Sequence, residues 1–174
     1  MTTLATIRPE SPADFDAIDE VNYQAFGQAA EGDLVRRLRD DGHTLHSLVA
    51  IDERDNLVGH ILFSRLKIVA PDATTNAVAL APMAVVPAHQ RRGVGSRLVE
   101  EGLVRCRNDG ERIVVVVGHP EYYPRFGFSS TLAARLVPPF DVPAEAWMAL
   151  ELIPSALACV EGRVEYAPPF SAVT

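Results

Sequence analysis

Cysteine is scarce in this sequence, which contains only Cys106 and Cys159 among 174 residues. Cys106 falls on the apolar side of an expected helix and Cys159 in an apolar turn, so we expect two buried free thiols. A disulfide framework needs several spaced cysteines, and a zinc site needs clustered Cys and His ligands. The sequence therefore argues against a disulfide-stabilised fold and against a metal site.

The sequence also lacks a leader and a long apolar run. Its first residues, MTTLATIRPE, contain neither a basic n-region nor an apolar h-region, so we expect no secretion signal. The longest uncharged stretch, residues 73–90, is polar at both ends and interrupted by prolines, which argues against a membrane span. No internal repeat, linker or low-complexity segment is present. A soluble cytoplasmic protein with no membrane partner is the simplest expectation.

An excess of positive charge is missing as well. The net charge of −7 disfavours a general nucleic-acid binder, and a hydrophobic fraction of 48% argues against disorder. The arginines cluster instead in one part of the sequence, which contains Arg91, Arg92, Arg97, Arg105, Arg107 and Arg112. Such a local patch suits one small anionic ligand better than a polymer. Interleaved carboxylates leave a solvated helix face as the alternative interpretation.

The stretch from Val78 to Asp109 predicts a strand, a glycine loop and a helix. A β-rich apolar segment leads into the loop, which reads QRRGVG from residue 90 to 95, and residues with helical spacing follow. Glycines let backbone N–H groups come close to a ligand, and a helix start directs its free N–H groups and positive dipole end at it. We therefore expect this loop to hold a phosphate, with added charge from Arg91 and Arg92.

Two common phosphate loops do not match this stretch. A Walker loop needs a Lys-Ser/Thr pair where this chain has Ser96-Arg97, and a dinucleotide fingerprint needs a glycine in place of Leu98. The pattern Gln-x-x-Gly-x-Gly, after a strand that contains Met83, instead resembles the pyrophosphate loop of the GNAT superfamily of N-acetyltransferases. For the loop taken alone, an ordinary strand-turn-helix with surface arginines is the alternative.

A second motif follows the apolar run at residues 113–117, which we expect to be a buried parallel strand. It reads GHPEYYPRFGF from residue 118 to 128. Many GNAT members have a Tyr four residues before a Gly-Phe pair that opens the next strand, and here that residue is Tyr123, before Gly127-Phe128. The motif YYxRFGF resembles a bacterial subgroup of uncharacterised acetyltransferases. The resemblance covers residues 5–130 well and residues 131–174 weakly.

The remaining segments predict further helices and strands. Expected strands lie at residues 5–7, 45–52, 57–68, 78–86, 147–153 and 164–166, and expected helices at 11–26, at 33–40 and after the glycine loop. The apolar side of this last helix is expected to carry Val94, Leu98, Val99, Gly102, Leu103 and Cys106. Because proline cannot donate to a sheet ladder, Pro82 predicts a bulge or a gap in pairing. The resemblance implies a single GNAT domain over residues 1–174, of the α/β (α+β) class. Its mixed, mostly antiparallel sheet would carry helices on both faces and a central parallel βαβ unit.

The resemblance also implies binding of acetyl-CoA and direct transfer of the acetyl group to a primary amine. The implied coenzyme-binding residues are Met83, Ala84 and Val85 for the pantetheine arm, and Gln90, Arg91, Arg92, Gly93, Val94, Gly95 and Ser96 for the pyrophosphate. Tyr123 is the implied general acid and would also contact the coenzyme. A phenol, with a pKa near ~10, can donate a proton as the thiolate forms. A packing residue whose hydroxyl only binds the sulfur is the alternative for Tyr123.

Several points stay open at this stage. The general base is unassigned among Glu121, His119, Glu151, His60 and water. We expect a small-molecule amine as the acceptor, with no nucleic acid as partner. A protein N-terminus or lysine, an acyl group larger than acetyl and a homodimer remain possible. The rival functions are a non-catalytic CoA-binding sensor and an interaction domain that kept only the fold.

Overall fold

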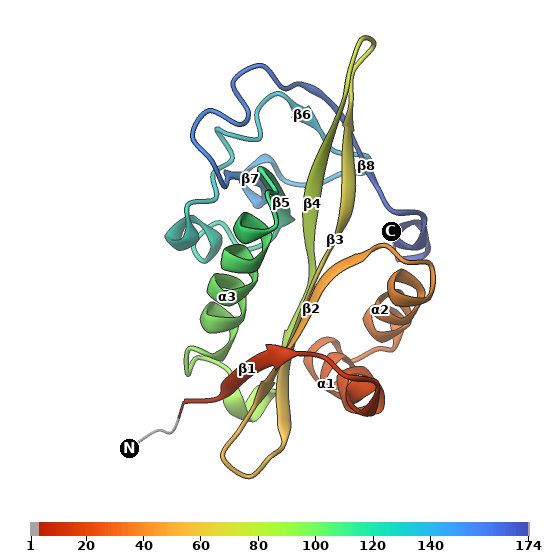
Figure 1. The fold of residues 1–174 in the computed structure, drawn as a ribbon, viewed down its shortest axis with the longest axis vertical. Helices are drawn as coiled ribbons and strands as arrows, with labels where there is room; N and C mark the ends of the chain where they lie inside the picture. The colour runs from red at the N-terminus through yellow and green to blue at the C-terminus, as the bar shows by residue number, and fades with distance from the viewer. Residues whose placement is uncertain (1–3, 174) are drawn as a thin grey trace.

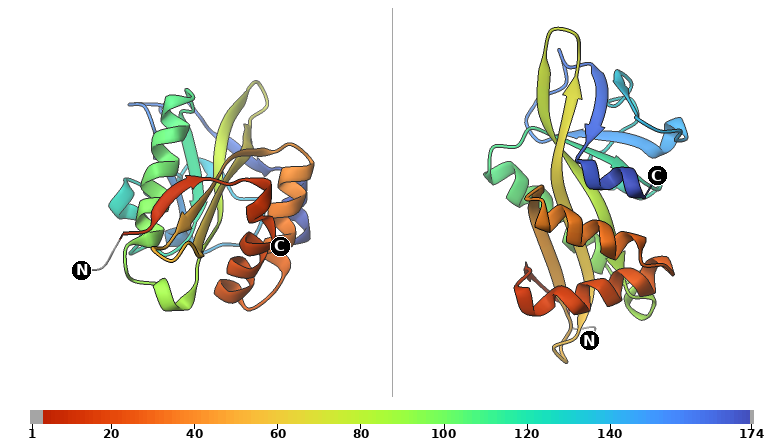
Figure 2. Two further views of the ribbon diagram at one scale, coloured as in Figure 1. Left: turned by 60° about the horizontal axis from the view of Figure 1, so that its bottom comes forward. Right: turned by 90° about the vertical axis from the view of Figure 1, so that its right-hand side faces the viewer.

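The structure, a computed structural model, describes residues 4–173 and is organised around one mixed β-sheet (Figure 1). The helices α1 and α2 cover one face of this sheet, and α3 covers the other (Figure 2). The elements are β1 (Thr6–Pro9), α1 (Phe15–Phe26), α2 (Ala30–Asp40), β2 (Thr44–Ile51), β3 (Leu57–Val69), β4 (Thr74–Val85), α3 (Val94–Asn108), β5 (Ile113–Val117), β6 (Leu136–Val137), β7 (Trp147–Glu151) and β8 (Gly162–Tyr166). The described residues also form five 3-10 helices, the last of them after β8: η1 (Pro12–Asp14), η2 (Pro87–His89), η3 (Tyr123–Phe126), η4 (Ala144–Ala146) and η5 (Pro168–Ala172).

The sheet runs in the order β1-β2-β3-β4-β5-β7, and β8 pairs with the outer half of β3 and with β6. Every neighbouring pair is antiparallel except β4–β5 and β6–β8. The parallel pair β4–β5 is joined through α3, which is the central βαβ unit that the sequence predicts. The expected fold class, a mostly antiparallel mixed sheet with helices on both faces, is therefore confirmed.

The helix α3 packs on the sheet along the stripe that its sequence predicts. Its buried residues are Val94, Leu98, Val99, Gly102, Leu103 and Cys106. A Cβ placed on Gly102 would lie 2.1 Å from the ring of Phe63, so only glycine lets this helix approach β3 so closely. This contact sets the distance between α3 and the sheet, and with it the position of the loop that leads into α3.

The central strand is irregular at Pro82, as the sequence predicts. Across β3 and β4, Ile61 pairs with Met83 and Phe63 with Leu80, so two residues of β4 stand opposite Leu62. Such a two-against-one arrangement is a β-bulge.

The sheet also splits along β4. The pairing between β4 and β5 consists of Val78 with Val114 and Ala79 with Val115. In the described part of the chain, no other strand takes up the second edge of β4 beyond Ala79. The backbone of Met83 therefore has a strand partner on its β3 side alone.

The C-terminal part joins the same sheet through β7 and β8. The buried Trp147 packs in the core, and its indole N–H donates to the carbonyl of Leu136 at 3.0 Å.

Two expectations are corrected here. Cys159 is exposed rather than buried, because it lies in a surface turn before β8. Gly127-Phe128 opens no strand, since the segment makes only an isolated bridge from Ser129 to Ala149. No helix among the described residues is long and apolar enough to span a bilayer.

Candidate functional site

A cavity of about 640 Å³ lies where β4, the start of α3 and the segment before η3 come together. Its lining residues are Ala25, Phe26, Met83, Ala84, Val85, Gln90, Arg91, Gly93, Gly95, Ser96, His119, Tyr122 and Arg125. Eight of the residues that the sequence assigns to coenzyme binding are among them: Met83, Ala84, Val85, Gln90, Arg91, Gly93, Gly95 and Ser96. Both predicted segments, the strand end and the glycine loop, therefore face one space.

The loop presents the start of α3 to this cavity without a cap. Arg91 and Gly93 adopt positive φ angles of 59° and 82°, which turn the chain sharply into the helix. Gly93 is the N-cap residue and has no side chain to accept from the helix. The first N–H groups of a helix have no partner within it, and the first turn of α3 contains no acidic residue. The resulting cluster of donors at a positive dipole end suits an anion.

Gln90 contributes to the loop through a backbone contact of its side chain. Its Nε2 donates to the carbonyl of Val85 at 3.0 Å. The amide thus ties the start of the loop to the end of β4. This geometry gives Gln90 a structural reason to be polar that does not depend on a ligand.

Three of the residues that the sequence assigns to the coenzyme do not line the cavity. Arg92 and Val94 line a different cavity of about 500 Å³, and Val94 also packs in the core. Tyr123 is only 7% exposed. Its ring meets Phe128 edge-on at 5.7 Å between centroids, and a Cβ on Gly118 would come within 2.2 Å of it. Burial raises the pKa of Tyr123 above that of an ordinary phenol.

The tyrosine that faces the cavity is Tyr122, which the sequence analysis did not select. Its hydroxyl is hydrogen-bonded to Ser96 Oγ at 3.2 Å, and the guanidinium carbon of Arg125 lies 4.7 Å from its ring centroid. The tandem tyrosine was the only signal in the sequence for this residue. The end of α1, with Ala25 and Phe26, was also missed, since neither residue type indicates a site.

The four candidate bases fall in different places. His119 is exposed and lines the cavity, and Glu121 lines a smaller neighbouring pocket together with it. Glu151, at the end of β7, accepts the N–H of Leu157 at 2.8 Å. Of the four candidates, only His119 is brought to the coenzyme-binding residues. No Asp or Glu is among the lining residues, and the described residues form no group of three metal-ligating side chains.

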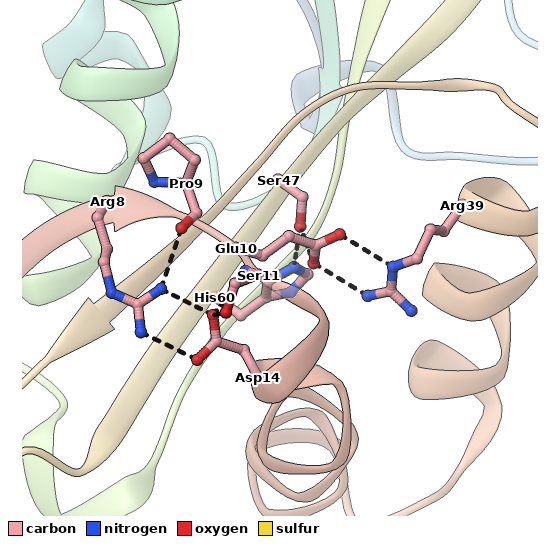
Figure 3. A network of polar contacts seen from close by, with 8 residues as sticks. All are labelled: Arg8, Pro9, Glu10, Ser11, Asp14, Arg39, Ser47 and His60. Atoms are coloured by element: carbon pink, nitrogen blue, oxygen red, sulfur yellow. Dashed lines mark hydrogen bonds and ion pairs between the residues drawn. The ribbon is translucent and has the colours of Figure 1, made fainter.

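His60, the fourth candidate, lies in a buried polar network (Figure 3). Asn22 Nδ2 lies 3.3 Å from His60 Nδ1, and His60 Nε2 lies 2.8 Å from Ser47 Oγ. The Ser47 hydroxyl donates to Glu10 at 2.6 Å, and Arg39 donates to both oxygens of Glu10 at 2.9 Å. Burial lowers the pKa of His60 to about 4, so its ring is neutral near pH 7. The network joins α1 and α2 to β2, to β3 and to the residue that follows β1.

Comparison with protein families and known proteins identifies relatives of this chain. Residues 6–131 match the family model of the acetyltransferase (GNAT) domain. The uncharacterized N-acetyltransferase YjhQ of Escherichia coli (strain K12) is 35% identical over 162 residues, which are 90% of this chain and 89% of YjhQ.

Solved structures agree with this match. The crystal structure of the GNAT family N-acetyltransferase YhbS from Escherichia coli in complex with CoA superposes with a TM-score of 0.89, at 33% identity over 97% of this chain and 92% of that one. A GNAT family acetyltransferase from Brucella melitensis in complex with acetyl-CoA gives a TM-score of 0.79, at 32% identity over 95% and 97% of the two chains. The chain belongs to the GNAT family of acetyltransferases.

Proposed function

We propose that this protein is an acetyl-CoA-dependent N-acetyltransferase that moves an acetyl group to the primary amine of a small molecule. Residues 1–174 would form one such domain. The observation that carries the proposal is the uncapped start of α3, which opens with Arg91 into a cavity that extends to the split edge of β4. Two relatives crystallised with CoA and acetyl-CoA support the same ligand.

The two ends of the cavity suit two parts of the coenzyme. Backbone N–H groups from Gly93 to Ser96, with the guanidinium of Arg91, would hold the diphosphate. The second edge of β4, which has no strand partner at Met83, Ala84 and Val85, would pair with the amides of the pantetheine arm. Preorganised backbone donors at this edge would also stabilise the oxyanion as the thioester is attacked.

In the reaction, the neutral amine nitrogen attacks the thioester carbonyl, the C–N bond forms and the C–S bond breaks. We assign Tyr123 as the general acid, which would give its phenolic proton to the departing sulfur. Burial raises the pKa of Tyr123, so the phenol is protonated near pH 7 and has a proton to donate. The proton released by the amine would pass to His119, which lines the cavity, or to water, and a proton from solvent would restore the phenol of Tyr123.

The acceptor would approach beside the end of α1, where Ala25 and Phe26 line the cavity. The buried position of Tyr123 and the absence of a carboxylate among the lining residues favour one rival, a CoA-binding sensor without turnover. A protein N-terminus or a lysine side chain is the rival acceptor.

The test has two parts. Isothermal titration with CoA measures binding, and the release of free CoA from acetyl-CoA with a panel of amines measures turnover. We expect binding, a rise in melting temperature with excess acetyl-CoA, and amine-dependent release of CoA. Binding without release for any amine or peptide would favour the sensor. A protein that does not bind CoA would refute the proposal. Release that requires a peptide would replace the small-molecule acceptor.

A further inference from the structure

Tyr122 stands where α3, β4 and the segment before η3 meet. Its hydroxyl lies 3.2 Å from Ser96 Oγ, in the first turn of α3. A Cβ placed on Gly95 would be 3.1 Å from the same hydroxyl and 3.5 Å from the thioether sulfur of Met83. The hydroxyl is therefore directed at the uncapped start of α3, from the opposite wall of the cavity.

The ring of Tyr122 is held in place by three aromatic or cationic neighbours. It meets Tyr123 edge-on, at 5.1 Å between centroids and 88° between planes, and Phe126 at 5.3 Å and 69°. Arg125 lies over the ring at 4.7 Å, a cation–π contact. A side chain fixed in this way loses little conformational entropy when a ligand arrives, so its hydroxyl is preorganised for binding.

The groups around the Tyr122 phenol are mainly donors and cations, while the carboxylate of Glu100 also acts on its pKa. Burial raises the pKa of Tyr122, so the phenol stays protonated and remains a donor near pH 7. Ser96 Oγ lies 3.2 Å from this hydroxyl in the first turn of α3, and the guanidinium of Arg125 lies over the ring. Such a set of donors complements phosphate oxygens rather than an ammonium group.

We propose that Tyr122 is a binding residue for the diphosphate of the coenzyme, to which its hydroxyl donates a hydrogen bond. The start of α3 and Arg91 supply one wall of the diphosphate site, and Tyr122 with Arg125 supplies the other. The hydrogen bond between Ser96 and Tyr122 shows the direction in which the Tyr122 hydroxyl would meet a ligand oxygen. This inference rests on the proposed function, because it assumes that CoA occupies the cavity.

Two other roles for Tyr122 give different results. A purely structural brace between η3 and α3 would show in the melting temperature and leave the dissociation constant of CoA unchanged. A proton donor to the thiolate would lower kcat at unchanged affinity. A diphosphate ligand lowers affinity for every ligand that contains the diphosphate, whether or not the pantetheine arm is present.

The experiment compares wild type with Tyr122→Phe by isothermal titration of CoA and of 3′-phosphoadenosine 5′-diphosphate, which lacks the pantetheine arm. A hydrogen bond to a charged group predicts a loss of about tenfold in affinity, of equal size for both ligands. The matched control is Tyr23→Phe, which removes an exposed phenol hydroxyl that does not line the cavity. This control should leave both dissociation constants unchanged.

Three outcomes would overturn the inference. The first is unchanged affinity for both ligands in Tyr122→Phe, whether or not the melting temperature falls. The second is a loss for CoA alone, which would move the contact to the pantetheine arm. The third is a loss of kcat with unchanged affinity. Failure of the proposed function is distinct from these, because wild type would then bind neither ligand.

Discussion

Tyr122 and Tyr123 are neighbours in the chain whose rings meet edge-on at 5.1 Å, yet only Tyr122 faces the cavity. Tyr123 lies behind it, 7% exposed and packed against Phe128. The two phenols therefore differ in their access to the cavity. Removing one hydroxyl at a time separates affinity from rate.

The Tyr123→Phe variant tests the assignment of the general acid. We expect unchanged affinity for CoA and a fall in kcat of about a hundredfold, which is at the low end of general acid catalysis. Steady-state kinetics and titration calorimetry on the same preparation measure both quantities. Tyr166→Phe is the matched control, since Tyr166 is another phenol whose pKa burial raises, and it lies among the C-terminal residues away from the cavity. Equal turnover in wild type and Tyr123→Phe would refute the assignment.

The Gly95→Ala variant tests the space at the start of α3. The added methyl group would lie 3.1 Å from the Tyr122 hydroxyl and 3.5 Å from the Met83 thioether, so it narrows the cavity. Alanine also favours a helix over glycine by about 1 kcal/mol. We expect an equal or higher melting temperature together with weaker binding of CoA, a combination that loss of fold cannot produce. Unchanged affinity would show that the coenzyme does not pass this point.

The Gly102→Ala variant should give the opposite pattern. Its Cβ would lie 2.1 Å from the ring of the buried Phe63, and neither α3 nor β3 can move without disturbing the core. Overpacking of this kind costs about 1–3 kcal/mol, or roughly 2–12 °C in melting temperature for a chain of this size. Thermal denaturation followed by circular dichroism measures the loss. A variant as stable as wild type would mean that α3 is less tightly packed than the structure indicates.

Cysteine reactivity tests the corrected position of Cys159. Cys106 is buried, and burial raises its pKa to about 12, whereas Cys159 is exposed. Because the thiolate is the reactive form, we expect one thiol to react with a disulfide reagent in the native protein and two after unfolding. The Cys159→Ser variant should show none in the native state. A fast second thiol in the native protein would contradict the burial of Cys106.

Much of the fold could be predicted because its signals are local. The apolar spacing of α3 placed the same six residues in the core that the structure buries. Pro82 predicted the bulge because a missing N–H has a direct effect on pairing. The turn around Cys159 could not be placed in this way. Apolar composition there reflects Ala156 and Leu157, which are buried, while the neighbouring cysteine side chain faces solvent.

The candidate site was predictable only in the part that one continuous segment of the chain forms. The loop from Gln90 to Ser96 is one continuous segment, so its sequence indicated its role. The opposite wall brings Phe26 of α1 and Tyr122 to the same cavity from elements far apart in the sequence. No periodicity or spacing connects such residues. The choice between two adjacent tyrosines depends on the turn that leads into η3, which sequence spacing does not determine.

The polar network around His60 makes stability depend on pH in a defined direction. His60 accepts from Asn22 through Nδ1 and donates to Ser47 through Nε2, so the neutral ring uses both nitrogens. Asn22 faces it from α1, and Ser47 from β2; Glu10 favours the charged ring and Arg39 opposes it. Burial dominates and lowers the pKa of His60 from 6.5 to about 4.

Below about pH 6.5 His60 is protonated in the unfolded chain, whereas in the folded protein it becomes protonated only near pH 4. The free energy of unfolding should therefore fall as the pH is lowered from 6.5 to 4. The full effect corresponds to roughly 3 kcal/mol. Urea denaturation at pH 7.5 and pH 5.5, where most carboxylates stay ionised, measures the dependence within the histidine range. The His60→Gln variant should flatten this dependence, whereas His46→Gln should retain it. A ring of His60 that titrates near pH 6.5 in the NMR spectrum of the folded protein would contradict the prediction, because the network would then accommodate the charged form.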